Sequence, residues 1–242
     1  MKKAIISDIH SNLEALTSVL ADIKSKGIDK IYCLGDIIGY GANPNEVIEL
    51  AKNFDLTIKG NHDLAMKVGR TYGDGYEMVE SIEWTQKQLS GPRNTDKLEF
   101  LENLPEEKLE DKILYIHGSP RSALNEYLEN ESNAKIIFEQ YMHVPDFCLI
   151  GHTHIPKIFQ YKDGNVSTIL PSEEPIALEP KMIINVGSVG QPRDNDNRAC
   201  WVSLIDNTIQ YHRVAYDYKK TQEKIIRAGL PEYLAIRLEG GK

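Results

Sequence analysis

The chain has 242 residues, of which 41% are hydrophobic and 26% are charged, with 17 glycines and 11 prolines. These proportions are typical of a folded globular protein and exclude a disordered, collagen-like or coiled-coil chain. The length predicts one large domain spanning residues 1–242. The formal net charge of −8 argues against a protein that binds long nucleic acid, because such proteins usually present a basic surface.

The cysteines and the N-terminus indicate where the protein works. Cys33, Cys148 and Cys200 are odd in number and irregularly spaced, as expected for a reduced intracellular protein. The apolar run after the two N-terminal lysines covers only residues 4–6, which is too short for an export signal, and no apolar stretch approaches the length of a membrane span. We therefore expect a cytoplasmic protein without a membrane partner.

The first 60 residues alternate between strand and helix patterns. Apolar runs at 4–7, 31–34 and 56–59 predict three strands. Between them, Asn12 is positioned to cap a helix whose apolar residues recur over 13–23, and Asn43 with Pro44 begins a second helix. This β-α-β-α-β order predicts a parallel sheet with crossover helices.

The rest of the chain changes character twice. Residues 64–110 are polar and favour short helices, and we expect them to form a pocket wall together with the loop after His117. Strand patterns return at 113–116 and 147–150, with two helical stretches between them, the second capped by Ser132. Hairpins follow with turns at 163–164 and 206–207, so the C-terminal half is predicted to be antiparallel. A helix over 218–228 ends at Gly229, and Pro231 begins one more turn.

Five short polar motifs each follow an apolar strand pattern directly. Ligands bind at the carboxyl ends of the strands in an open α/β sheet, so these motifs should meet at one edge. Their polar residues are Asp8, His10, Asp36, Asn61, His62, Asp63, His117, His152 and His154. Of the seven histidines in the chain, only His143 and His212 lie outside the motifs, and for these two we expect structural or surface roles.

The residue types in these motifs predict a metal centre. Carboxylate, imidazole and amide groups together suit Mn²⁺, Fe²⁺, Zn²⁺ or Co²⁺ better than an all-oxygen Ca²⁺ site. The absence of cysteine from the motifs disfavours a closed structural zinc site. The groups are too numerous for one ion and suit two ions bridged by a carboxylate, an arrangement that supports attack on phosphorus.

The order and spacing of the motifs over residues 8–154 resemble the calcineurin-like metallophosphoesterase superfamily. Its signature is Asp-x-His, Gly-Asp, Gly-Asn-His-Asp/Glu, His and Gly-His-x-His. Residues 39–41, 117–120 and 185–193 resemble the small prokaryotic branch, which is grouped with phosphodiesterases, diadenosine tetraphosphatases and protein phosphatase-like enzymes. The resemblance implies a four-layer α/β/β/α sandwich with mixed sheets and a metal site at the carboxyl ends of the strands.

The resemblance also implies a role for each motif residue. His62 would protonate the leaving oxygen, and Asp63 would orient His62. The cofactors would be two divalent transition-metal ions, with Mn²⁺ favoured and Fe, Zn, Ni or Co as alternatives. The first ion would be held by Asp8, His10 and His154, the second by Asn61, His117 and His152, and Asp36 would bridge the two.

The implied reaction is hydrolysis of a small phosphodiester or phosphomonoester by attack of a metal-bound hydroxide on phosphorus, with phosphodiesters favoured. A dinucleoside polyphosphate hydrolase, such as a diadenosine tetraphosphatase, and a protein phosphatase-like enzyme are alternatives. A non-catalytic metal-binding scaffold is disfavoured because no ligand and no catalytic histidine is missing. The net charge favours a small phosphoester or nucleotide substrate over long DNA or RNA.

Some predicted substrate contacts have an alternative structural role. Gly187 and Ser188 could form a turn that cradles a phosphate, with Arg193 holding a substrate oxygen, or the turn could simply pack near the metals. Arg121 could contact the substrate or form a surface salt bridge, and Tyr40 could line the pocket or close the core.

One position departs from the family pattern. Many members of the superfamily carry a second Asp three residues after the bridging one, where this chain has Gly39. The second Asp usually lies outside the first metal shell, so we expect metal binding to be kept and the shape and polarity of the pocket mouth to change.

Overall fold

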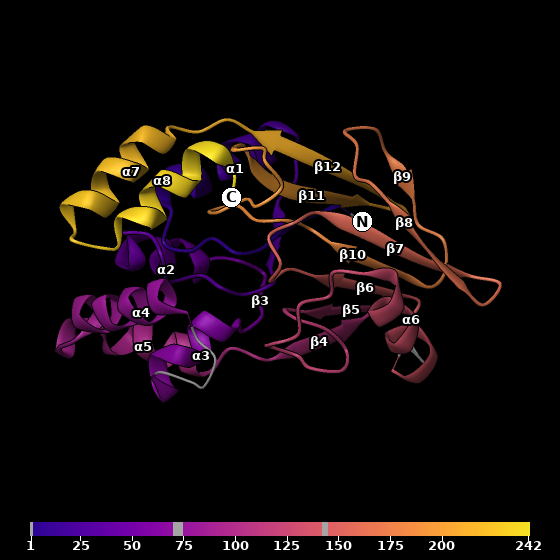
Figure 1. Cartoon of the computed structure of the whole chain (residues 1–242), viewed down its shortest axis with the longest axis horizontal. Helices are drawn as coiled ribbons and strands as arrows, with labels where there is room; N and C mark the ends of the chain where they lie inside the picture. Colours follow the sequence, from indigo (N-terminus) through magenta and orange to yellow (C-terminus); the bar gives the residue numbers. More distant parts are fainter. Residues whose placement is uncertain (1, 70–74, 142–144) are drawn as a thin grey trace.

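The computed structural model describes residues 2–69, 75–141 and 145–242, which form two mixed six-stranded sheets and flanking helices (Figure 1). His143, for which we expect a structural or surface role, lies outside these residues.

The first sheet contains the predicted β-α-β-α-β unit. Its strand order is β3-β2-β1-β11-β12-β9, with β1, β2 and β3 parallel and the other pairs antiparallel. These strands are β1 (Lys2–Ile6), β2 (Lys30–Cys33), β3 (Leu56–Thr57), β9 (Ile176–Ala177), β11 (Ala199–Ile205) and β12 (Thr208–Val214). The crossover helices are α1 (Leu13–Ser25) and α2 (Pro44–Ala51). Asn12 Oδ1 accepts a hydrogen bond from Ala15 N at 3.1 Å and caps α1 as predicted.

The second sheet has the strand order β4-β5-β6-β10-β7-β8. Its strands are β4 (Glu107–Glu110), β5 (Ile113–Ile116), β6 (Phe147–Ile150), β7 (Lys157–Lys162), β8 (Asn165–Ile169) and β10 (Met182–Asn185). Strand β6 pairs in parallel with both β5 and β10. The hairpins β7-β8 and β11-β12 turn at 163–164 and 206–207, as predicted.

The two sheets face each other across a buried apolar layer. Successive side chains of a strand point to opposite faces, so Ile5 belongs to the core between the sheets while Ala4 and Ile6 pack under α1 and α2. Likewise, Leu149 faces the first sheet, and Cys148 and Ile150 pack under helix α6 (Glu131–Gln140). This is the expected four-layer α/β/β/α sandwich with mixed sheets.

The remaining helices gather at one end of the molecule, away from α6 (Figure 1). They are α3 (Asn61–Val68), α4 (Tyr76–Leu89), the 3-10 turn η1 (Pro92–Asn94), α5 (Thr95–Glu102), α7 (Tyr218–Arg227) and α8 (Glu232–Gly240). Helices α7 and α8 lie side by side, and their apolar cluster around Leu234 packs against Tyr40 and against Trp84 of α4. The C-terminal helices are thereby fixed next to the loops that follow β1 and β2.

Several local predictions were wrong. In the described residues between β5 and β6 there is one helix, α6, and its cap is Asn130, whose side chain accepts from Asn133 N at 2.9 Å. Ser132 lies inside that helix. Strand β4 interrupts the segment expected to be helical, and α8 has nine residues instead of one turn. The C-terminal half is not purely antiparallel, because β10 pairs in parallel with β6. None of the helices in the described ranges is both long and apolar enough to cross a membrane.

Candidate metal centre

The carboxyl ends of strands from both sheets bring the motif residues together. Asp8 and His10 follow β1, Asp36 follows β2, His117 follows β5, and His152 follows β6 with His154 two residues later. Asn61 and His62 form the first turn of α3. Apart from Asn61, which is partly exposed, all the predicted ligands are buried.

The first cluster contains Asp8, His10, Asp36 and His154, whose donor atoms all lie within 4.8 Å of one another. The Nε2 atoms of His10 and His154 are 2.9 Å apart. Asp8 Oδ1 lies 3.3 Å from His154 Nε2, and Asp36 Oδ2 lies 3.6 Å from His10 Nε2. The structure thus assembles the three residues expected at the first ion together with the expected bridge.

The second cluster shares Asp36 with the first. His117, His152 and Asp36 form a group within 4.8 Å, and Asp36 Oδ2 lies 3.4 Å from His117 Nε2. His117 Nε2 lies 3.1 Å from His152 Nδ1 and 3.1 Å from Asn61 Oδ1. Asp36 Oδ1 accepts from the His62 backbone N–H at 2.9 Å, which leaves Oδ2 directed between the two clusters.

The backbone contacts of the imidazoles fit a bound cation. Nδ1 of His10, His117 and His154 lies 3.1, 2.7 and 2.6 Å from the carbonyl oxygens of residues 38, 34 and 191. Each carbonyl needs a donor, so Nδ1 carries a proton on all three rings, and Nε2 carries a lone pair on the neutral rings of His10 and His154. Two such lone pairs at 2.9 Å repel each other unless a cation lies between them. With metal–nitrogen bonds near 2.1 Å, ligands at right angles are about 3 Å apart, which matches the observed spacing.

The loops that carry the ligands adopt an unusual backbone. Asp8, His10, Asp36, His152 and His154 all have φ between 49° and 66°, in the left-handed region. Each such residue costs on the order of 1 kcal/mol, so five of them in one cluster are typical of a functional site. The fold keeps these conformations because they aim the side chains at the shared centre.

Close approach of the loops depends on glycine. A Cβ atom on Gly60 would lie 2.0 Å from Asp36 Oδ1, so any other residue would displace the bridging carboxylate. At Gly39, where φ is +90°, a Cβ atom would lie 2.3 Å from His62 Nδ1. Gly39 therefore lets the His62 ring lie against the backbone of the loop after Asp36, and in this chain an Asp at position 39 would collide with that ring.

The histidines differ in their protonation. Burial lowers the pKa of His154 to about 4 and that of His152 to about 3, and it holds the pKa of His10 well below its usual value. Burial also opposes charge on His117, but the Asp36 carboxylate outweighs it and raises the pKa of His117 to about 9. At neutral pH the metal-free centre is thus expected to have neutral imidazoles except at His117.

His62 and Asp63 occupy separate positions. His62 is buried, its ring lies 4.5 Å from that of Tyr40, and its Nε2 is 4.0 Å from Asp36 Oδ2. The expected contact from Asp63 is absent in the described part of the chain, where His62 Nδ1 has no hydrogen-bond partner. The Asp63 carboxylate accepts instead from the backbone N–H groups of Gly60, Asp36 and Ile37 at 2.9–3.0 Å. Asp63 therefore stabilises the backbone of the loop that carries the bridging residue Asp36.

A cavity of about 600 Å³ opens beside the second cluster. It is bordered by Asn61 and His152, and part of its wall comes from Leu64, Ala65 and Val68 of α3 and from Glu77 and Met78 of α4. Its volume lies within the range of pockets that hold nucleotide-sized ligands. Tyr40 and Arg193 line the cavity, as anticipated for substrate contacts.

Three other anticipated substrate contacts do not reach this cavity. Ser188 is buried, and its hydroxyl donates to Asp8 O at 2.8 Å, so it stabilises the metal-binding loop. Gly187 packs against Cys200. Arg121 forms an ion pair with Glu126 on the protein surface. At all three positions the alternative structural role is the one observed.

The cavity residues that the sequence did not single out include Tyr127 and Arg237. Tyr127 stacks on His152 with a ring centroid distance of 3.9 Å, and Arg237 reaches the cavity from α8. Tyr127 lies in the loop after His117, which was expected to build part of the pocket wall, although the residue itself was not named. Arg237 lies 83 residues after His154 in an ordinary helical pattern, and no local signal marks it.

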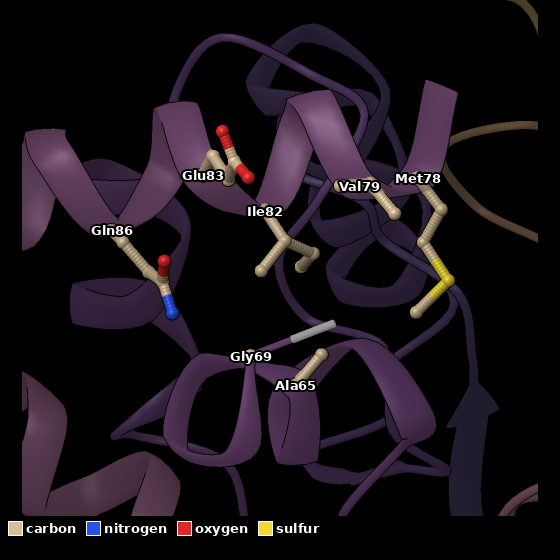
Figure 2. A pocket seen from close by; sticks show the side chains of 7 residues that line it. All are labelled: Ala65, Gly69, Met78, Val79, Ile82, Glu83 and Gln86. Atoms are coloured by element: carbon tan, nitrogen blue, oxygen red, sulfur yellow. The ribbon is translucent and has the colours of Figure 1, made fainter. Parts of the chain in front are cut away.

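A smaller cavity of about 110 Å³ lies between α3 and α4 (Figure 2). Ala65 and Met78 border it and also border the larger cavity. Figure 2 shows Ile82 of α4 directed towards α3 across this space. None of the metal-cluster residues lines it, so the chemistry belongs to the larger cavity.

Comparison with known proteins agrees with this geometry. Residues 1–208 match the model of the calcineurin-like phosphoesterase superfamily domain. The chain is 42% identical to the uncharacterized protein MJ0912 of Methanocaldococcus jannaschii, with 99% of this chain and 98% of that protein covered. It is 29% identical over 47% of its length to a symmetrical bis(5'-nucleosyl)-tetraphosphatase of Methylobacillus flagellatus, of which 41% is covered.

Among solved structures, the crystal structure of a metallophosphoesterase from Sphaerobacter thermophilus is similar over 100% of this chain and 99% of that chain, with 36% identity and a TM-score of 0.88. Both the fold and the buried Asp/His clusters are those expected of a metal-dependent phosphoesterase. The chain belongs to the calcineurin-like phosphoesterase superfamily and is a phosphoesterase, a hydrolase of phosphoric esters.

Proposed function

We propose that this protein is a dinuclear metal-dependent phosphodiesterase acting on small phosphoesters. The observation that carries the proposal is the arrangement of the two donor clusters around Asp36 Oδ2, which lies 3.6 Å from His10 Nε2 and 3.4 Å from His117 Nε2. The first cluster would hold one divalent ion, and the second, completed by Asn61, would hold another. Two such ions supply Lewis-acid activation of water and neutralise the charge of the phosphoryl oxygens.

The residues around the clusters would bind and orient the phosphoryl group. Arg193, fixed by bonds of 3.2 and 2.8 Å from its Nε and Nη2 to Gln191 Oε1, presents a rigid guanidinium at the cavity. Buried His62, whose ring lies 4.5 Å from that of the cavity residue Tyr40, would donate a proton to the leaving oxygen. Burial lowers the pKa of His62, and an anionic phosphoryl group beside it would raise that pKa again.

The remaining features are proposed on the same basis. We place the whole chain in one catalytic domain, because Arg237, which lies beyond the family match at 1–208, borders the same cavity as Asn61. We favour Mn²⁺ because mixed carboxylate, amide and imidazole donors suit it. Three buried free cysteines are consistent with a cytoplasmic location, and the net charge of −8 favours a small substrate over long nucleic acid.

A second candidate is hydrolysis of a dinucleoside polyphosphate. It is favoured by the 29% identity to the symmetrical bis(5'-nucleosyl)-tetraphosphatase over 47% of this chain. It is also favoured by the cavity of about 600 Å³, which is larger than a simple phosphate requires. Diester and phosphoanhydride hydrolysis would use the same donor clusters, so the substrate must be distinguished by assay.

The proposed function is tested with bis-p-nitrophenyl phosphate and Mn²⁺. The purified protein should release p-nitrophenolate, and His62→Ala should retain the metals while losing turnover by about 10²–10⁴-fold. His212→Ala is a matched control, because His212 stacks on Trp201 with a centroid distance of 4.1 Å in the first sheet and is not a member of either cluster. Full turnover by His62→Ala would refute the assigned acid, and no turnover by the Mn²⁺-loaded wild type would refute the diesterase. Two further substrates are assayed in parallel. Preferred hydrolysis of diadenosine tetraphosphate would favour the second candidate, and preferred hydrolysis of p-nitrophenyl phosphate would indicate a monoesterase.

A further inference from the structure

Two arginines that have no Asp or Glu partner in the described part of the chain border the cavity. Arg198 and Arg213 each form an ion pair with an aspartate, as Arg121 does with Glu126. Arg193 and Arg237 form no ion pair with an Asp or Glu among the residues that the structure describes, although both are half-buried. A buried or half-buried cation is stabilised by an anion, so Arg193, which bonds only the neutral Gln191 amide, indicates an anionic ligand, and Arg237 adds a second positive charge to the same cavity.

The two guanidinium groups lie at different depths. The charge of Arg193 contributes to the low pKa of His10, His62 and His154, which places it within electrostatic reach of the first cluster. Its guanidinium carbon lies 5.9 Å from the centroid of the Tyr40 ring. Arg193 is therefore positioned for the phosphoryl group that reacts at the metals.

Arg237 lies farther out, on α8. Its guanidinium carbon is 5.1 Å from the centroid of the Tyr233 ring. Its Nε donates to the terminal carboxylate of Lys242, which orients the side chain and leaves its two Nη groups for a ligand. Burial and the nearby charge of Arg193 both lower the pKa of Arg237, so the two cations repel each other across the cavity. An anion between or beside them would relieve that repulsion.

One acidic side chain also faces this space. Glu77 of α4 lines the same cavity and acts on Arg237 electrostatically, but in the described ranges its carboxylate is not within ion-pair distance of either arginine. It would oppose an anion bound there without neutralising the arginines. The aromatic face of Tyr127, which is 47% exposed, borders the space between the metal clusters and α8.

We propose that Arg237, with Arg193, forms a second anion subsite that accepts a phosphate group other than the one hydrolysed. The preferred substrates would then be small phosphoesters that carry a second phosphate, with the reacting group at the metal clusters and the second group at Arg237. This specificity rests on the proposed phosphoesterase function, which it deepens by naming the substrate class.

The test compares two chromogenic diesters that differ by one phosphate. They are thymidine 5'-(p-nitrophenyl phosphate) and the same compound with an additional 3'-phosphate. A charge-assisted contact to the second phosphate should raise kcat/KM for the substrate with the 3'-phosphate by about 10- to 100-fold in the wild type. Arg237→Gln should reduce this ratio to near one, and Arg237→Lys should retain part of it. Glu77→Gln should change the ratio in the opposite direction and raise it.

Arg227→Gln is the matched control, because Arg227 is an exposed arginine at the end of neighbouring α7 and does not line the cavity. It should keep the wild-type ratio. A wild-type ratio near one would overturn the subsite, and so would a ratio unaffected by Arg237→Gln in a protein that melts like the wild type.

Binding measurements separate this inference from the proposed function. Calorimetry with thymidine 3',5'-bisphosphate and thymidine 5'-phosphate should show at least tenfold tighter binding of the bisphosphate in the wild type and no such difference in Arg237→Gln. If that result is obtained with a protein that hydrolyses neither diester, the subsite stands and the diesterase fails. If both diesters are hydrolysed but the bisphosphate gains no affinity, the diesterase stands and the subsite fails.

Discussion

Asp36 organises the centre at the scale of single residues. Its Oδ1 is held by the backbone of His62, and its Oδ2 faces histidines of both clusters. Gly60 makes this possible because a Cβ atom there would collide with Asp36 Oδ1. The sequence predicted each member of the clusters, since every motif follows a strand and carries ligand-type side chains. It could not predict Asp63's backbone contacts, because these depend on how two loops meet.

Gly39→Ala should separate metal binding from catalysis. The added methyl group would meet His62 Nδ1 at 2.3 Å, and φ of +90° would be strained, so the ring must move. We expect turnover to fall by at least tenfold while metal content is unchanged, as measured by hydrolysis of bis-p-nitrophenyl phosphate and by elemental analysis. Gly164→Ala is the control, because it has φ of +78° with nothing within 4 Å. Equal effects of both substitutions would show that backbone strain alone is responsible.

Metal binding at the second cluster should release a proton from His117. In the metal-free protein the pKa of His117 is about 9, and a metal requires the neutral imidazole. Below pH 9 the metal must displace that proton, so the apparent affinity should rise by roughly tenfold per pH unit and level off above pH 9. Calorimetry at pH 7 in buffers of different ionisation enthalpy should show that about one proton is released when the metal ion binds at the second cluster. The first cluster should show little change above pH 5, because the pKa of His154 is lowered to about 4. Proton-free binding at both clusters would contradict this assignment.

At the scale of secondary-structure elements, the strands and the strongly patterned helices were predictable from the sequence. The apolar runs of β1, β5 and β6 and the capped helix α1 were predicted within a few residues. Prediction failed where the local sequence is ambiguous: α6 is capped by Asn130 instead of Ser132, and both residue types are good caps. Strand β4 exists because it pairs with β5, and only the assembled sheet supplies that partner.

The Asp63 carboxylate connects the start of α3 to the loop after β2 through hydrogen bonds, so removing it should lower both the stability of the fold and the affinity for metal. In Asp63→Ala the buried N–H groups of Gly60, Asp36 and Ile37 would lose their acceptor. We expect a loss of roughly 2–4 kcal/mol in the free energy of unfolding together with weaker metal binding. Asp63→Asn retains one acceptor oxygen and should lie between the alanine variant and the wild type. Chemical denaturation of metal-free and metal-loaded proteins measures this, and wild-type stability in Asp63→Ala would refute the role.

At the scale of the whole molecule, both sheets and the C-terminal helices converge on one centre. The first sheet contributes Asp8 and Asp36, the second contributes His117 and His152, and α8 contributes Arg237 to the cavity wall. The sequence could not predict this last contact, because the packing of α7 and α8 against Tyr40 and Trp84 joins residues far apart in the chain. The family resemblance implied the layers, and the buried clusters explain why the net-negative chain can still attract a phosphate when cations are bound.

Metal removal should destabilise the whole fold. Asp8 and Asp36 are buried like charges that bound cations would neutralise. At metal concentrations about 100 times Kd, binding contributes about 2.7 kcal/mol, which corresponds to a fall in Tm of roughly 5–10 °C after chelation. Differential scanning calorimetry with chelator and with Mn²⁺ added back measures this shift. An identical Tm with and without metal would show that the clusters do not bind it.

The central claim is that two metal ions share Asp36, and it is tested most directly by anomalous diffraction from crystals of the Mn²⁺-loaded protein. We predict two anomalous peaks about 3.5–4 Å apart. One should lie among Asp8, His10 and His154, and the other should be coordinated by Asn61, His117 and His152, with Asp36 in the coordination shell of both. A single peak, or two peaks that do not share Asp36, would contradict the account.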